Sequence, residues 1–89
     1  MVGGSFMQLA LFPTSASLVR IDPACNAWRY YELTIQPDLF GGAALMRRWG
    51  RIGTQGRLRL DLFVDAGAAA NQLARLSRQK LARGYAPRP

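Results

Sequence analysis

Apolar and polar residues alternate most clearly between residues 28 and 36. Tyr31, Leu33 and Ile35 fall on one face of an extended chain, and the positions between them are mostly polar. Alternation of this kind is typical of a strand that is covered on one side, so these three side chains should face the core. Pro37 follows and ends the pattern, because proline cannot donate a hydrogen bond to a neighbouring strand.

Three further stretches predict strands. Residues 17–22 alternate moderately, residues 43–52 form a central strand, and residues 57–64 return after a hairpin turn at residues 53–56. This turn begins and ends with glycine, which readily adopts positive φ. In the returning strand, one face carries leucines and the other carries charged residues. Such alternation predicts an antiparallel sheet with one covered and one wet side. The two faces are Leu58, Leu60 and Leu62, against Arg57, Arg59 and Asp61.

A helix is predicted to cover this sheet. Asp65 is a suitable N-cap, residues 66–82 are rich in helix formers, and Gly84 ends the element. Lys80 interrupts the apolar stripe of this helix, so it either extends past the sheet edge to solvent or points at a ligand. The stripe consists of Ala66, Ala69, Ala70, Leu73, Leu76 and Ser77.

The predicted architecture is therefore α+β, a twisted antiparallel β-sheet of about four strands with one C-terminal α-helix packed on a face. Eighty-nine residues allow one small domain with a single core. We expect an N-terminal arm over residues 1–16, which forms an edge strand or covers the sheet or a neighbouring subunit. The domain itself is expected over residues 17–86, with a short basic tail at 87–89.

Candidate chemistry is concentrated in the stretch from Leu45 to Gly56. On a strand, Arg47, Trp49 and Arg51 point the same way, so one indole is flanked by two guanidinium groups. A flat aromatic group between planar cations suits a ligand with a stackable surface and negative charge, and nucleic acid fits best. The alternative is a tryptophan that packs in the core while the arginines extend around it.

These residues also resemble a known family. Trp49-Gly50-Arg51 followed by Ile52-Gly53-Thr54 is similar to the signature of the WGR domain, which is named after that tripeptide. Each motif alone is weak, but the ordered set covers roughly residues 18–85 and is specific. The other matching elements are Asn26, Arg29-Tyr30-Tyr31, Leu33, Phe63, Lys80 and Gly84-Tyr85.

The resemblance implies an antiparallel sheet with a helix, and a part in recognising DNA ends. In poly(ADP-ribose) polymerases, the tryptophan of the domain packs against the sugar of a terminal nucleotide, with the arginine nearby. Carried over by position, this implies a stacking role for Trp49 and a charged contact from Arg51, with Asn26 and Arg29 near the same surface. Catalysis in those polymerases belongs to a separate domain. The matching arginine of those polymerases also helps to transmit the DNA signal between domains, so we expect Arg51 to be either a ligand contact, a structural residue, or a contact to a partner protein.

Charge agrees with an anionic partner. Twelve Lys plus Arg residues stand against five acids, which gives a net charge of +7. So basic a small domain favours nucleic acid or an acidic protein surface. The alternative is that the charge serves solubility and that the arginines reflect the codon usage of a GC-rich genome.

Catalytic and metal-binding classes are poorly supported. Cys25 is the single cysteine, histidine is absent, and Glu32 is the single glutamate. No nucleophile–base pair, phosphate-binding loop or metal-ligand spacing is present, so we expect no enzyme, no metal and no cofactor. No apolar run approaches the length of a membrane span, and we expect a cytoplasmic protein.

We therefore predict a non-catalytic nucleic-acid-binding module, with DNA ends or breaks favoured over RNA. The alternative is a module for protein–protein interaction or for homodimer formation through the same face, because interfaces also favour aromatic residues and arginine. Phosphate contacts would bind without reading sequence. The predicted contact residues are Trp49, Arg51, Arg47, Asn26, Arg29, Arg57, Arg59 and Lys80.

Overall fold

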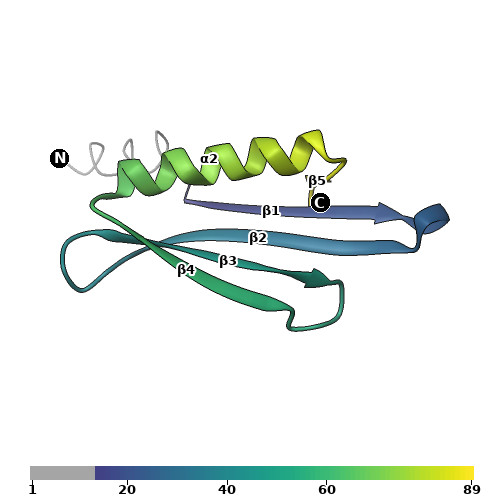
Figure 1. Cartoon of the computed structure of the whole chain (residues 1–89), viewed down its shortest axis with the longest axis horizontal. Helices are drawn as coiled ribbons and strands as arrows, with labels where there is room; N and C mark the ends of the chain where they lie inside the picture. Colours follow the sequence, from purple (N-terminus) through teal and green to yellow (C-terminus); the bar gives the residue numbers. More distant parts are fainter. Residues whose placement is uncertain (1–13) are drawn as a thin grey trace.

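The computed structural model describes residues 14–89, and the predicted apolar arm lies largely outside this part of the chain. Five strands, one α-helix and one short 3-10 turn follow each other along it (Figure 1). The elements are β1 (Ser15–Asp22), η1 (Pro23–Cys25), β2 (Ala27–Pro37), β3 (Ala43–Arg51), β4 (Arg57–Phe63), α2 (Ala66–Ala82) and β5 (Ala86–Pro87).

The strands form one antiparallel sheet in the order β4-β3-β2-β1-β5, and α2 lies along one face of it (Figure 1). The predicted α+β class and the single C-terminal helix are confirmed. The sheet has five strands where about four were expected, because Ala86 and Pro87 pair with β1. The amide of Arg88 then donates to the carbonyl of Ser17 at 2.8 Å, so the chain continues beside β1 after β5 ends.

The core lies between α2 and the middle strands. Tyr31 and Leu33 of β2 are 4% and 1% exposed, which confirms the face assigned from alternation. Their neighbours across the sheet and the buried stripe of the helix complete one apolar cluster. That cluster is Leu18, Tyr31, Leu33, Leu45, Leu73 and Leu76, with Ala69 and Ala70 also buried on the helix.

Both ends of α2 follow from local chemistry. The carboxylate of Asp65 accepts a hydrogen bond from the amide of Ala68 at 2.8 Å, as predicted for an N-cap. At the other end Gly84 has φ +95° and its amide donates to the carbonyl of Leu81. The amide of Tyr85 donates to the carbonyl of Lys80 at 3.0 Å. This pair of bonds is a Schellman motif, and it brings residue 85 back over the last turn of the helix.

On β4 the apolar face is exposed and the charged face lies on the side of the sheet that carries α2, which reverses the usual arrangement. Leu58, Leu60 and Leu62 are 55%, 58% and 73% exposed, on the side of the sheet that α2 does not cover. The charged side shares the face of the sheet that carries α2, where Asp61 pairs with two arginines while Arg57 and Arg59 stay exposed. The Asp61 carboxylate lies 2.9 Å from Nη2 of Arg47 and 3.0 Å from Nε of Arg59. Alternation correctly predicted the strand, but apolar character did not predict which side is covered.

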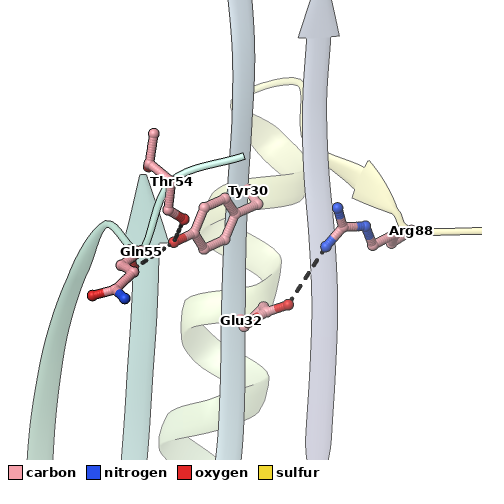
Figure 2. Close-up of polar contacts among 5 residues, drawn as sticks. All are labelled: Tyr30, Glu32, Thr54, Gln55 and Arg88. Carbon is pink, nitrogen blue, oxygen red and sulfur yellow. Dashed lines mark hydrogen bonds and ion pairs between the residues drawn. The ribbon is translucent and has the colours of Figure 1, made fainter. Parts of the chain in front are cut away.

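The β3–β4 turn folds over the uncovered face and buries one tyrosine there. The hydroxyl of Tyr30 lies 3.0 Å from the carbonyl oxygen of Thr54 and 2.8 Å from that of Gln55 (Figure 2). Tyr30 is only 5% exposed, although alternation placed it on the polar side of β2. Its ring and hydroxyl therefore fix the turn that follows Trp49.

The opposite edge of the sheet has its own cross-link. Arg88 reaches across β1 to the carboxylate of Glu32, with 3.5 Å between Nη1 and Oε2 (Figure 2). This ion pair joins the residue after β5 to β2. Within residues 14–89, no helix is long and apolar enough to cross a membrane.

Candidate nucleic-acid interface

An open cleft of about 350 Å³ lies where α2 stops and the sheet continues. The β1–β2 end of the sheet extends beyond the last turn of the helix (Figure 1). This leaves the helix-side face of β2 and β3 uncovered at that end, next to the C-terminal turn of α2. The cleft is lined by Asn26, Arg29, Tyr30, Trp49, Gly50, Arg51, Lys80 and Tyr85.

Trp49 forms one wall of the cleft. It is directly opposite Tyr31 in the β2–β3 register, and the two ring centroids are 6.3 Å apart. The indole is half-buried and packs against the edge of the core, while it also lines the cleft. The two alternatives drawn from the sequence are thus combined: one side of the ring is structural and the other borders open space.

A row of three arginines crosses the sheet at this end. Arg20 of β1 is opposite Arg29 of β2, and Arg29 is opposite Arg51 of β3. All three lie on the helix-side face, because residues directly opposite in an antiparallel sheet share a face. Within residues 14–89 no carboxylate lies within ion-pairing distance of any of them. Like charges directly opposite destabilise a sheet, so the row stores repulsion that an anion would relieve.

Lys80 completes the positive cluster from the helix side. Its Nζ lies 4.6 Å from the ring centroid of Tyr31 and 5.3 Å from that of Tyr85, within the range of cation–π contacts. Burial lowers the pKa of Lys80, and the positive charges of Arg83, Arg29 and Arg47 lower it further. The lowered pKa means that the fold disfavours the ammonium form, as expected where several cations converge.

Asn26 lies at the junction between η1 and β2. It adopts the left-handed conformation with φ 52° and ψ 37°, and its amide donates to the carbonyl of Pro23 at 3.1 Å. Asparagine tolerates this conformation better than most residues. Asn26 also lines the cleft, so this position belongs both to the turn and to the candidate site.

Three predicted contact residues lie outside the cleft lining. Arg47 and Arg59 both pair with Asp61. Burial opposes the charge of Arg47, but Tyr31 and Asp61 outweigh it, so the pKa of Arg47 is raised. Arg57 is opposite Trp49 on β4 and is exposed. The structure therefore brings together Trp49, Arg51, Asn26, Arg29 and Lys80, and places Arg47, Arg57 and Arg59 to one side.

Sequence reasoning missed two contributors to this region. Tyr85 matched the family pattern, but its place in the cleft follows from the Schellman motif at the helix end. Arg20 lies on β1 opposite the cleft-lining Arg29, and a Cβ added at Gly84 would lie 3.3 Å from its Nε. The register between β1 and β2 is the signal that would have identified Arg20, because it aligns Arg20 with Arg29.

Comparisons with known proteins agree with the architecture. A crystal structure of a Bacteroides fragilis protein superposes with a TM-score of 0.71 over 84% of this chain and 19% of that one, at 20% identity. Uncharacterized protein y4dW of Sinorhizobium fredii is 47% identical over 70 residues, which are 79% of this chain and 34% of that protein. The chain thus spans about a third of the length of this relative. The first likeness shows the fold alone.

The family itself is shown by a match over nearly the whole chain. The family model of the WGR domain matches residues 14–89, which include the Trp49-Gly50-Arg51 signature, the cleft and α2. WGR domains are non-catalytic and are known in general as nucleic-acid-binding modules. With its signature residues lining a cleft beside the last turn of its one described helix, this chain belongs to the WGR domain family.

Proposed function

We propose that the chain binds DNA at ends or breaks through this cleft. The observation that carries the proposal is the convergence of one indole and three cationic side chains on one open cavity. Trp49, Arg29 and Arg51 reach it from the sheet, and Lys80 reaches it from the helix. Within residues 14–89 none of these cations is paired with a carboxylate.

The size and lining of the cleft favour a terminal nucleotide. A volume of about 350 Å³ is at the lower end of ligand pockets, which suits one nucleotide rather than a stretch of duplex. Trp49 offers a flat surface against which a base or sugar can pack, and Tyr85 supplies a second aromatic ring. An interior base pair is stacked on both sides, so only an end, a nick or a single strand exposes such a surface.

The cations supply a phosphate site beside this stacking surface. Planar guanidinium groups bind phosphate oxygens in pairs, and Arg29 and Arg51 lie side by side across two strands. Binding would neutralise their mutual repulsion as well as the charge of Lys80. Contacts of this kind read no sequence and weaken with added salt.

The test is a binding panel measured by fluorescence anisotropy at several salt concentrations. The chain should bind blunt, nicked and overhanging DNA more tightly than closed circular DNA of the same sequence. The circular DNA serves as a competitor that has no ends. RNA hairpins and single strands form separate arms. Trp49→Ala should weaken binding to ends by about tenfold or more, the order expected for loss of one stacked base.

Trp28→Ala is the matched control. Trp28 is the other tryptophan, 37% exposed and on the helix-free face. Its removal should leave affinity unchanged. Equal losses in both variants, or no binding to any nucleic acid at low salt, would reject the proposal and favour a protein-interaction role for the cleft.

A further inference from the structure

The strand β4 forms one edge of the sheet, and its sequence is unusually apolar for an exposed edge strand. Within residues 14–89 it pairs with β3 on one side only. An exposed edge presents unpaired amide and carbonyl groups, and proteins normally protect such edges with charges, proline or short strands. Here the strand is seven residues long and carries three exposed leucines. This combination favours pairing with another strand.

The sequence of β4 is complementary to itself when reversed. Around Leu60 as a centre, position 59 faces position 61 of an antiparallel second copy, and position 58 faces position 62. Arg59 of each copy would then be opposite Asp61 of the other, which gives two oppositely charged pairs on the helix side. Leu58 would be opposite Leu62, and Leu60 opposite its own counterpart, on the helix-free side.

Shifted registers lose this match. Centring the pair on Arg59 still sets Arg57 opposite Asp61 but places two Arg59 side chains opposite each other, and centring it on Asp61 places two carboxylates opposite each other. Like charges directly opposite destabilise a sheet, whereas opposite charges and apolar pairs stabilise it. Of these three registers, the one about Leu60 is the one in which residues 58–62 set no like charges opposite each other. Asp61 keeps its contact with Arg47, which comes from β3.

We propose that two copies of this chain pair through β4 in an antiparallel register centred on Leu60. The symmetry is an isologous two-fold axis normal to the sheet, because opposite residues in an antiparallel pair share a face. The two sheets then form one continuous sheet with both α2 helices on the same side. The leucines of both copies form one apolar strip on the other side. The two clefts point toward opposite ends of the strands.

The first test is the mass of the chain in solution. Sedimentation equilibrium at rising concentration should show a monomer of 9.8 kDa converting to a species of twice that mass. Leu60→Lys places two ammonium groups opposite each other and should raise the dissociation constant by about tenfold or more. Ile21→Lys is the matched control, since Ile21 is 52% exposed on the same face but lies on β1.

Two outcomes of this test would overturn the proposal. One is a monomer at every concentration up to the millimolar range. The other is equal weakening by Ile21→Lys and Leu60→Lys, which would indicate that the sheets pack face to face instead of edge to edge.

Charge reversal tests the register. Arg59→Asp should weaken the homodimer because the new aspartate of each copy lies opposite Asp61 of the other, which gives two pairs of opposed carboxylates. Asp61→Arg should weaken the homodimer in the same way, because the new arginine of each copy lies opposite Arg59 of the other. A mixture of the two variants should recover the wild-type dissociation constant, since every opposed pair is again complementary. No recovery on mixing two folded variants would reject this register.

A cross-link provides a readout that does not depend on the Arg47–Asp61 contact. Opposed Cα atoms in an antiparallel pair are about 4.5–5.5 Å apart, which a disulfide can span. In a Cys25→Ser background, which removes the exposed native thiol, Leu60→Cys should form a linked dimer under mild oxidation. Leu58→Cys should not, because its counterpart lies four positions away along the paired strand. The reverse pattern would contradict the proposal.

Discussion

Arg29 and Arg51 are directly opposite each other on β2 and β3, on the helix-side face of the sheet. Within residues 14–89 no carboxylate lies within 4.0 Å of either, although the five acids of the chain all fall in this range. Asp61 and Glu32 pair with arginines elsewhere, while Asp65 and Asp38 accept hydrogen bonds from backbone amides. The fold thus neutralises charge away from the cleft and leaves it uncompensated within.

This pair predicts a conflict between stability and binding. Arg51→Met removes one of two opposed like charges but keeps an unbranched apolar stem. The free energy of unfolding without nucleic acid should rise by about 0.5 kcal/mol. Affinity for DNA ends should fall by about tenfold, because one phosphate contact is lost. Urea denaturation and anisotropy measure the two quantities on the same preparation.

Arg75→Met is the control for this prediction. Arg75 is exposed on the solvent side of α2, so the same change there should alter neither quantity appreciably. A loss of stability in Arg51→Met would show that Arg51 supports the fold, and a stability gain without loss of affinity would place the ligand elsewhere.

The turn after β3 predicts a pair of glycine substitutions with unequal effects. Gly56 has φ +67°, and a Cβ added there would collide with the carbonyl oxygen of Trp49 and lie 2.5 Å from the hydroxyl of Tyr30. Gly56→Ala should therefore lower the free energy of unfolding by about 3 kcal/mol. Gly53 has φ +92° and open space around it, so Gly53→Ala should cost about 1 kcal/mol. Thermal denaturation distinguishes the two, and equal losses would show that conformation alone limits this turn.

Lys80 allows a direct measurement of the potential in the cleft, because it is the single lysine of the chain. Its pKa in the fold lies below its ordinary value, chiefly through burial and then through Arg83, Arg29 and Arg47. Between this lowered pKa and the ordinary one the unfolded chain binds more protons, so this residue makes stability rise with pH in that window. Bound phosphates would favour the ammonium form and raise the pKa of Lys80.

The expected shift can be followed by NMR of the Lys80 side chain as pH is raised, with and without a short duplex. The midpoint should move upward in the complex. Lys80→Arg provides the comparison for affinity, since it keeps the positive charge at any accessible pH. An unchanged midpoint in saturated protein would show that no phosphate approaches Lys80.

The two tryptophans predict different optical responses to nucleic acid. Trp49 lines the cleft, whereas Trp28 lies on the helix-free face opposite Ile21. In Trp28→Phe, the fluorescence of Trp49 should change on addition of DNA ends, because its exposed face becomes stacked. In Trp49→Phe, the emission of Trp28 should stay constant. A response confined to Trp28 would move the binding surface to the other face of the sheet.

The local pattern of apolar and polar residues was sufficient to predict the helix and the four longer strands of this fold. The helix predicted at residues 66–82 has those bounds in the structure, and the strands agree within two residues. Lys80 was identified as an exception to the apolar stripe, and it lies where the helix borders the cleft. These features depend on side-chain period and capping, which act over a few residues and are therefore readable from sequence.

Features that depend on the register between distant strands could not be predicted from the sequence. Arg20 lies beside Arg29 because β1 pairs with β2 in one particular alignment, and Tyr30 is buried because a turn 24 residues later folds over it. The leucines of β4 face solvent because Asp61 pairs on the helix side with Arg47 of the neighbouring strand. Each outcome depends on a contact between distant residues, which periodicity within one strand does not contain.

The place where α2 stops determines whether the molecule has a ligand site. One more helical turn, continued in the same direction, would cover more of the β1–β2 end of the sheet, which the last turn of α2 leaves open (Figure 1). Gly84 prevents this by taking a backbone conformation that other residues adopt at a cost, and Arg20 crowds the space that a side chain there would enter. Gly84 thus determines where α2 ends. Changing the length of α2 offers protein designers a simple way to widen, narrow or close the cleft.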